Sequence, residues 1–67
     1  MNLSEMITET ATAVVAAREV GADPVPVMRR TTRSLRLELT PEVERAIWMR
    51  ARNLWNASER AALELAA

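Results

Sequence analysis

Apolar residues recur at helical spacing between residues 3 and 20, and most polar residues lie off this stripe. The stripe consists of Leu3, Met6, Ile7, Val14, Ala17 and Val20. Asn2 and Glu5 have the spacing of a capping box, and Gly21 stands where a left-handed C-terminal cap is expected. The sequence therefore predicts an amphipathic N-terminal helix over residues 1–21.

Two prolines interrupt the helical pattern in the next segment. Pro24 and Pro26 alternate with valine, which disfavours a helix and favours an extended, polyproline-like backbone. We expect residues 22–29 to be an extended linker between two units. The alternative is that the two prolines dock in an aromatic groove of a partner protein.

A strict two-residue alternation follows and ends in a helix-start signal. Its two faces consist of Leu35, Leu37 and Leu39 on one side and Ser34, Arg36 and Glu38 on the other. Thr40 followed by Pro41 is a favoured N-cap and first helical position. The sequence predicts a short strand that leads directly into a helix.

Helical spacing resumes after Thr40 and produces a wide apolar side. This side carries Val43, Ala46, Ile47, Ala51 and Leu54, with Trp48 and Trp55 along its flank. The pattern weakens around residues 53–58, because Asn and Ser compete with the helical backbone hydrogen bonds. We expect a break there, with Asn56 or Ser58 capping a separate helix over residues 59–65, although one unbroken helix is the alternative.

These elements predict a mostly α fold with one short β-strand, in which residues 30–67 form a strand-helix-helix unit. A single chain of 67 residues buries only about 60% of the surface that its unfolded form exposes. Cys and His are absent, so neither disulfides nor the commonest metal ligands supplement the core. We expect a homodimer or docking on a larger partner, with no metal and no cofactor.

The net charge is zero, but the charges are unevenly distributed. Residues 1–23 hold four acids and one Arg, residues 24–37 hold four Arg and no acid, and the remainder holds five Glu and four Arg. The centre of the chain is therefore basic. Because no secretory signal and no apolar run of about 20 residues is visible, we expect a cytoplasmic protein. The use of Arg and Ala further indicates a bacterial or phage origin.

The strand followed by Thr-Pro-Glu and by a second helix start near Ser58 and Glu59 resembles the ribbon-helix-helix family of DNA-binding proteins. The resemblance covers residues 30–67 and implies an intertwined dimer whose paired strands enter the major groove. It further implies a transcriptional regulator that binds double-stranded DNA sequence-specifically.

Site residues follow from this resemblance in three groups. The resemblance assigns base contacts to Ser34, Arg36 and Glu38. Arginine is the side chain that most often binds guanine with two hydrogen bonds. Phosphate contacts fall to Arg29, Arg30 and Arg33 and to the backbone N–H groups near Ser58. The dimer interface is expected at Leu35, Leu37, Leu39, Ile47, Trp48, Leu54 and Trp55.

A different class of function fits the same residues, namely a small phage-type assembly or adaptor protein that acts through protein contacts alone. Trp48, Trp55 and Met49 favour it, because aromatic residues and Met are enriched at interface hot spots. In that case residues 35–39 would add a strand to a partner's sheet. Catalysis is not expected, because the serines have no His partner and the carboxylates have no basic group to complete a site.

Overall fold

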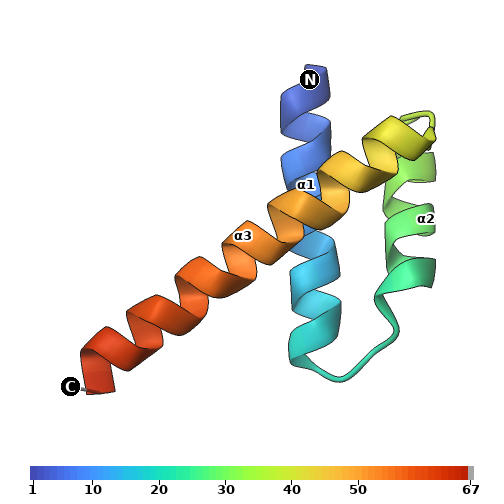
Figure 1. Cartoon of the computed structure of the whole chain (residues 1–67). Helices are drawn as coiled ribbons and strands as arrows, with labels where there is room; N and C mark the ends of the chain where they lie inside the picture. The colour runs from blue at the N-terminus through green and yellow to red at the C-terminus, as the bar shows by residue number, and fades with distance from the viewer. Residues whose placement is uncertain (67) are drawn as a thin grey trace.

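The computed structural model describes residues 1–66, which form three helices: α1 (Leu3–Glu19), α2 (Pro24–Ser34) and α3 (Pro41–Ala66). Helices α1 and α2 run antiparallel, and α3 crosses α1 diagonally (Figure 1). The predicted strand-helix-helix fold is wrong, because no strand forms within residues 1–66. None of the three helices combines the length and the apolar character that crossing a membrane requires.

Helix α1 is fixed by the capping groups that its sequence predicts. The Glu5 N–H donates to Asn2 Oδ1 at 2.8 Å, and the Asn2 N–H donates to the Glu5 carboxylate at 3.4 Å. At the other end Gly21 has a φ of 75°. The N–H groups of Gly21 and of the next residue donate to carbonyls of the last helical turn, at 3.1 and 2.9 Å. The capping box and the left-handed glycine cap are therefore confirmed.

The extended linker expected at residues 22–29 is helical from Pro24 onward. The Asp23 side chain caps this helix by accepting a hydrogen bond from the Val25 N–H at 3.0 Å. Pro24 and Pro26 both fall in the first turn, whose N–H groups have no partner within the helix in any case. Two prolines therefore cost α2 no backbone hydrogen bond, and the extended prediction is corrected.

The segment predicted as a strand is the C-terminal cap of α2 followed by a loop. Leu35 is the C-cap, and Arg36 has a left-handed φ of 56°. The Arg36 and Leu37 N–H groups donate to carbonyls in the last turn of α2, at 3.1 and 2.9 Å, as in a Schellman motif. The three leucines are half-buried, whereas Arg36 and Glu38 are exposed. The alternation therefore reflects a loop that packs alternate side chains inward, with no neighbouring strand to form a ladder.

We expect Arg36→Gly to stabilise the protein by about 1 kcal/mol, because a left-handed backbone costs a residue with a Cβ about that much. Arg36 is exposed, so little packing is lost. The matched control is Arg33→Gly, which places glycine inside the last turn of α2 and should destabilise by a similar amount. Urea unfolding followed by circular dichroism checks both; a loss of stability in both variants would contradict the assigned cap.

Helix α3 begins as the sequence predicts but does not break. The Val43 N–H donates to Thr40 Oγ1 at 3.2 Å, which confirms Thr40 as the N-cap. The break expected near Asn56 or Ser58 is wrong, because the helix continues to Ala66. Asn53, Asn56 and Ser58 are all exposed, and Ala, Glu, Arg and Leu, which are strong helix formers, make up the rest of the final turns.

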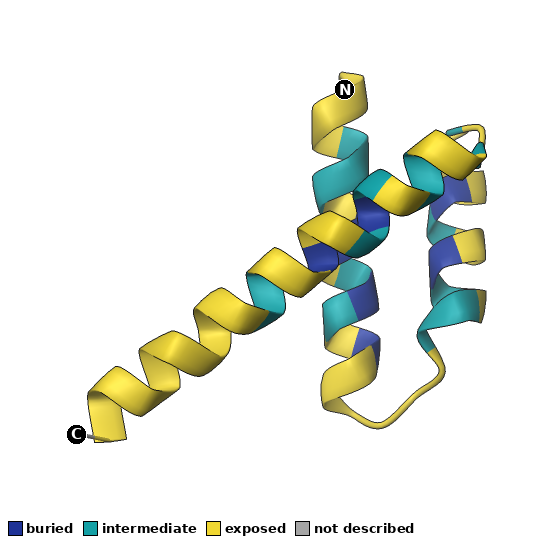
Figure 2. Cartoon of the chain, in the orientation of Figure 1, coloured by how far each residue is buried: buried dark blue, intermediate teal, exposed yellow. Residues whose placement is uncertain are grey.

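The core lies on the facing sides of the three helices, where the buried positions gather (Figure 2). Its buried apolar side chains come from all three helices: Ala11, Val14 and Ala17 from α1, Met28 from α2, and Ile47 and Ala51 from α3. Two buried threonines, Thr10 and Thr32, donate to the carbonyls of Met6 and Met28 at 2.8 and 3.0 Å. The core is thus small, and every buried side-chain nitrogen or oxygen atom in residues 1–66 has a hydrogen-bond partner.

Candidate functional site

Three arginines project from one side of α2, the side that faces away from the core. Arg29 and Arg33 are four residues apart, and Arg30 and Arg33 are three apart, so all three share one face of the helix. All are exposed, whereas Met28 and Thr32 on the opposite side are buried. We call Arg29, Arg30 and Arg33 the arginine face. The chain carries no acid between Asp23 and Glu38, so this face has one sign of charge.

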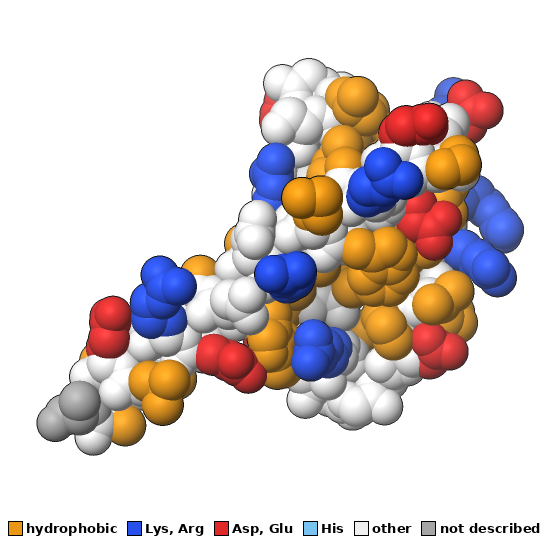
Figure 3. Space-filling model, viewed as in Figure 1, with side chains coloured by type: hydrophobic (Ala, Val, Ile, Leu, Met, Phe, Trp, Pro, Cys, Tyr) orange, Lys and Arg blue, Asp and Glu red, His pale blue; other side chains and the backbone are white. Residues whose placement is uncertain are grey.

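The arginine face lies at an edge of the molecule. Basic side chains gather there over α2, away from the projecting end of α3 (Figure 3). Beside it is a shallow hollow of about 300 Å³ lined by Arg29, Thr32, Arg33, Leu37 and Leu39. Two guanidinium groups with apolar walls form a surface that an anionic group such as phosphate fits, because Arg presents donors in a planar fork.

The residues predicted to read bases do not lie on a ribbon. Ser34 is the last residue of α2, Arg36 occupies the left-handed turn, and Glu38 lies in the loop that follows. All three are exposed. Their predicted role on a two-stranded ribbon is wrong, because the segment has no strand geometry. Ser34 lies four residues after Arg30 on α2, and Arg36 follows within two residues of the end of the helix.

Ser58 lies in the middle of α3 rather than at a helix start. Backbone N–H groups are free to bind an anion only in the first turn of a helix. The helix start on which the predicted phosphate contact at Ser58 depends is therefore absent from α3.

Most of the residues predicted as a dimer interface lie in or against the core of the single chain. Ile47 is fully buried, and Leu39, Trp48 and Leu54 pack against the same cluster. Leu35, Leu37 and Trp55 are half-buried. The stretch of α3 that is left exposed lies beyond these residues, from Asn56 to Ala66.

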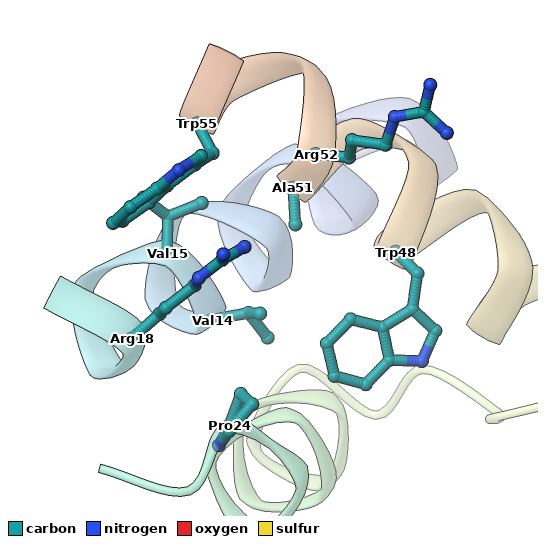
Figure 4. A pocket seen from close by; sticks show the side chains of 8 residues that line it. All are labelled: Val14, Val15, Arg18, Pro24, Trp48, Ala51, Arg52 and Trp55. Atoms are coloured by element: carbon teal, nitrogen blue, oxygen red, sulfur yellow. The ribbon is translucent and has the colours of Figure 1, made fainter. Parts of the chain in front are cut away.

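Trp48 and Trp55 form the walls of an apolar groove of about 490 Å³ between α1 and α3 (Figure 4). We call it the tryptophan groove; its lining residues are Val14, Val15, Arg18, Pro24, Trp48, Ala51, Arg52 and Trp55. The guanidinium carbon of Arg18 lies 4.4 Å from the centre of the Trp55 ring, which is a cation–π contact. Arg52 lies on the rim with its guanidinium group pointing outward.

Both indole N–H groups of the groove have partners on α3 itself. Trp48 Nε1 donates to Glu44 Oε1 at 3.4 Å, and Trp55 Nε1 donates to Glu59 Oε1 at 2.8 Å. These hydrogen bonds hold the two rings in place, with Arg18 over one face of Trp55 and both side chains only partly buried.

The sequence predicted Trp48 and Trp55 as contact residues but missed the other wall of the groove. Arg18 and Pro24 belong to segments that were expected to lie in separate units. The packing of α3 on α1 brings Arg18 beside Trp55, and the antiparallel packing of α2 on α1 brings Pro24 to the same groove; no sequence spacing carries that information.

Comparisons of the chain with protein-family models, with curated proteins and with solved structures found no match. They therefore neither support nor refute the resemblance to the ribbon-helix-helix family, and the interpretation of the site rests on its geometry.

Proposed function

We propose that this protein binds nucleic acid without catalysis, through phosphate contacts from the arginine face of α2. The observation that carries the proposal is the projection of Arg29, Arg30 and Arg33 from one exposed side of a helix without acidic neighbours in its sequence. Arg36, at the end of the same helix, adds a fourth positive charge. Local charge of one sign drives association with phosphates even where the whole chain is neutral.

The position of α2 suits this role. An α-helix with its side chains is about 10–12 Å wide, which matches the major groove of DNA. Helix α2 packs through its inner side on α1 and leaves its outer side open (Figure 2). The hollow beside Arg29 and Arg33 would hold a phosphate at the margin of the same surface.

The test is the salt dependence of binding to a labelled random-sequence DNA duplex, measured by fluorescence anisotropy. Removing two phosphate contacts in the double variant Arg29→Ala, Arg33→Ala should reduce the slope of log affinity against log salt by about 2. The matched control is Arg45→Ala, Arg60→Ala, which removes the same charge from exposed positions on α3. The wild-type slope should persist in the control.

Two results would overturn the proposal. One is a wild-type protein that does not bind the duplex even at low salt. The other is an equal loss of affinity in both double variants, because that would trace binding to the total charge of the chain and not to the arginine face.

A second candidate function is that of an adaptor acting through protein contacts, and one observation favours it. The tryptophan groove and the exposed end of α3 together offer apolar surface that the chain does not cover. Aromatic side chains in a preformed groove are typical anchors of protein interfaces. In the anisotropy experiment an adaptor would show no salt-sensitive binding to DNA at any salt concentration.

A further inference from the structure

Helix α3 continues far beyond the core on which it packs. Its 26 residues span about 39 Å at 1.5 Å per residue, and the longest dimension of the molecule is 42 Å. Every residue from Asn56 to Ala66 is exposed, including Leu63 at 72% and Leu65 at 89%. We call residues 56–66 the arm. Its lack of cover is plain in Figure 2.

The side of α3 that forms the tryptophan groove continues along the arm. Residues seven apart lie on the same side of a helix, so Ala62 follows Trp48 and Trp55, and Ser58 and then Leu65 follow Ala51. Glu59, Ala62 and Leu63 bound a further hollow of about 440 Å³ on the arm. One continuous surface therefore begins at Trp48 inside the groove and ends at the C-terminal turns of α3.

The charges on this surface differ between its two halves. Arg18 and Arg52 stand at the groove. The arm presents Glu59, which is seven residues after Arg52 and so lies on the same side of α3. The groove half thus has an excess of positive charge, from Arg18 and Arg52 against Glu44, whereas the arm presents Glu59 with small or apolar side chains on this side.

We infer that a second copy of this chain covers the surface, with the two α3 helices antiparallel about a two-fold axis. In this arrangement the arm of each copy lies along the tryptophan groove of the other. Glu59 then approaches the cationic groove half of its partner, and Ala62 allows the two helices to come close. Because each copy supplies one groove and one arm, the contact is made twice and leaves no open end.

The small core of the single chain gives a second reason for a second copy. Six apolar side chains are buried among the described residues 1–66. Chains of this size commonly need an additional source of burial, and cysteine is absent. The leucines of the arm and the rings of the groove are the apolar side chains that the dimer would remove from water.

The experiment compares the solution mass of the wild-type chain with that of Ala62→Arg by sedimentation equilibrium. We expect wild type to sediment at twice its chain mass of 7.5 kDa. Ala62 is exposed in the single chain, so the variant should keep its helical circular dichroism. Facing the partner's cationic groove, the new arginine should weaken the dimer by about tenfold or more.

The matched control is Ala57→Arg, which places the same side chain on the same arm but on the opposite side of α3. The control should remain dimeric. A wild-type chain that stays monomeric up to about 1 mM, the weak end of specific association, would overturn the inference. Equal weakening by Ala57→Arg and Ala62→Arg would also overturn it. No nucleic acid is present in this measurement, so its outcome is independent of the function proposed above.

Discussion

Ile47→Ala should lower the free energy of unfolding by about 2–5 kcal/mol. Ile47 is fully buried where α3 crosses α1, so the change removes apolar contacts and leaves a cavity among helices that cannot close completely. Domains of this size have a total stability of about 3–10 kcal/mol. Truncating this one side chain should therefore remove a large part of the free energy of unfolding. Urea unfolding followed by circular dichroism would measure the loss.

The matched control for this change is Met49→Ala. Met49 lies two residues further along α3 and is 61% exposed, so its truncation should change the unfolding free energy by less than about 0.5 kcal/mol. Similar losses for the two variants would contradict the assignment of Ile47 to the core. The comparison also bears on the sequence prediction, which placed Ile47 at a dimer interface and not inside one chain.

The parts of the fold that the sequence predicts correctly are those determined by neighbouring residues. Asn2 and Glu5 form their capping box because both partners lie within one helical turn. Gly21 adopts its left-handed conformation because it lacks a Cβ, and Thr40 caps α3 through its own side chain. Each of these features depends on contacts within a few residues, so a local pattern is sufficient to reveal it.

The parts that the sequence does not predict are those in which one pattern of residues fits two different backbone conformations. Pro24 and Pro26 fit an extended chain and also fit the first turn of a helix, and Asp23 decides between them only once it acts as the cap. Leucines at alternate positions fit a strand and also fit a loop with one side buried. A strand forms only if a second strand lies beside the segment to share its hydrogen bonds, and the local sequence does not reveal whether one does.

The same reasoning explains how much of the candidate site could be predicted. The basic segment was visible in the sequence as four arginines without an acid. The geometry of this segment was not visible, because an extended backbone through Arg29 and Arg30 would turn the two side chains to opposite sides, whereas α2 places both with Arg33 on one face. The helical state of this segment therefore changes the form of the proposed contact from a ribbon in the groove to the outer side of a helix.

The variant Glu59→Pro should distinguish a continuous helix α3 from two helices with a break near Ser58, which is the form that the sequence predicts. If Ser58 capped a separate helix, position 59 would be its first residue, where proline is well tolerated. Inside a continuous helix the same proline loses a backbone hydrogen bond and clashes with the preceding turn, at a cost of about 3 kcal/mol. Because α3 runs unbroken from Pro41 to Ala66, we expect the helical circular dichroism to fall.

The control for this variant is Glu59→Ala, which also removes the hydrogen bond to Trp55 but retains a strong helix former. It should keep the helical signal of wild type. Every residue of the arm is exposed, so Glu59→Pro should mainly unwind the arm: the helical signal should fall, while the unfolding free energy of the single chain should drop by less than the full cost of about 3 kcal/mol. An undiminished helical signal in the proline variant would mean that α3 ends before residue 59, and the arm on which the inferred dimer depends would not exist as one rigid helix.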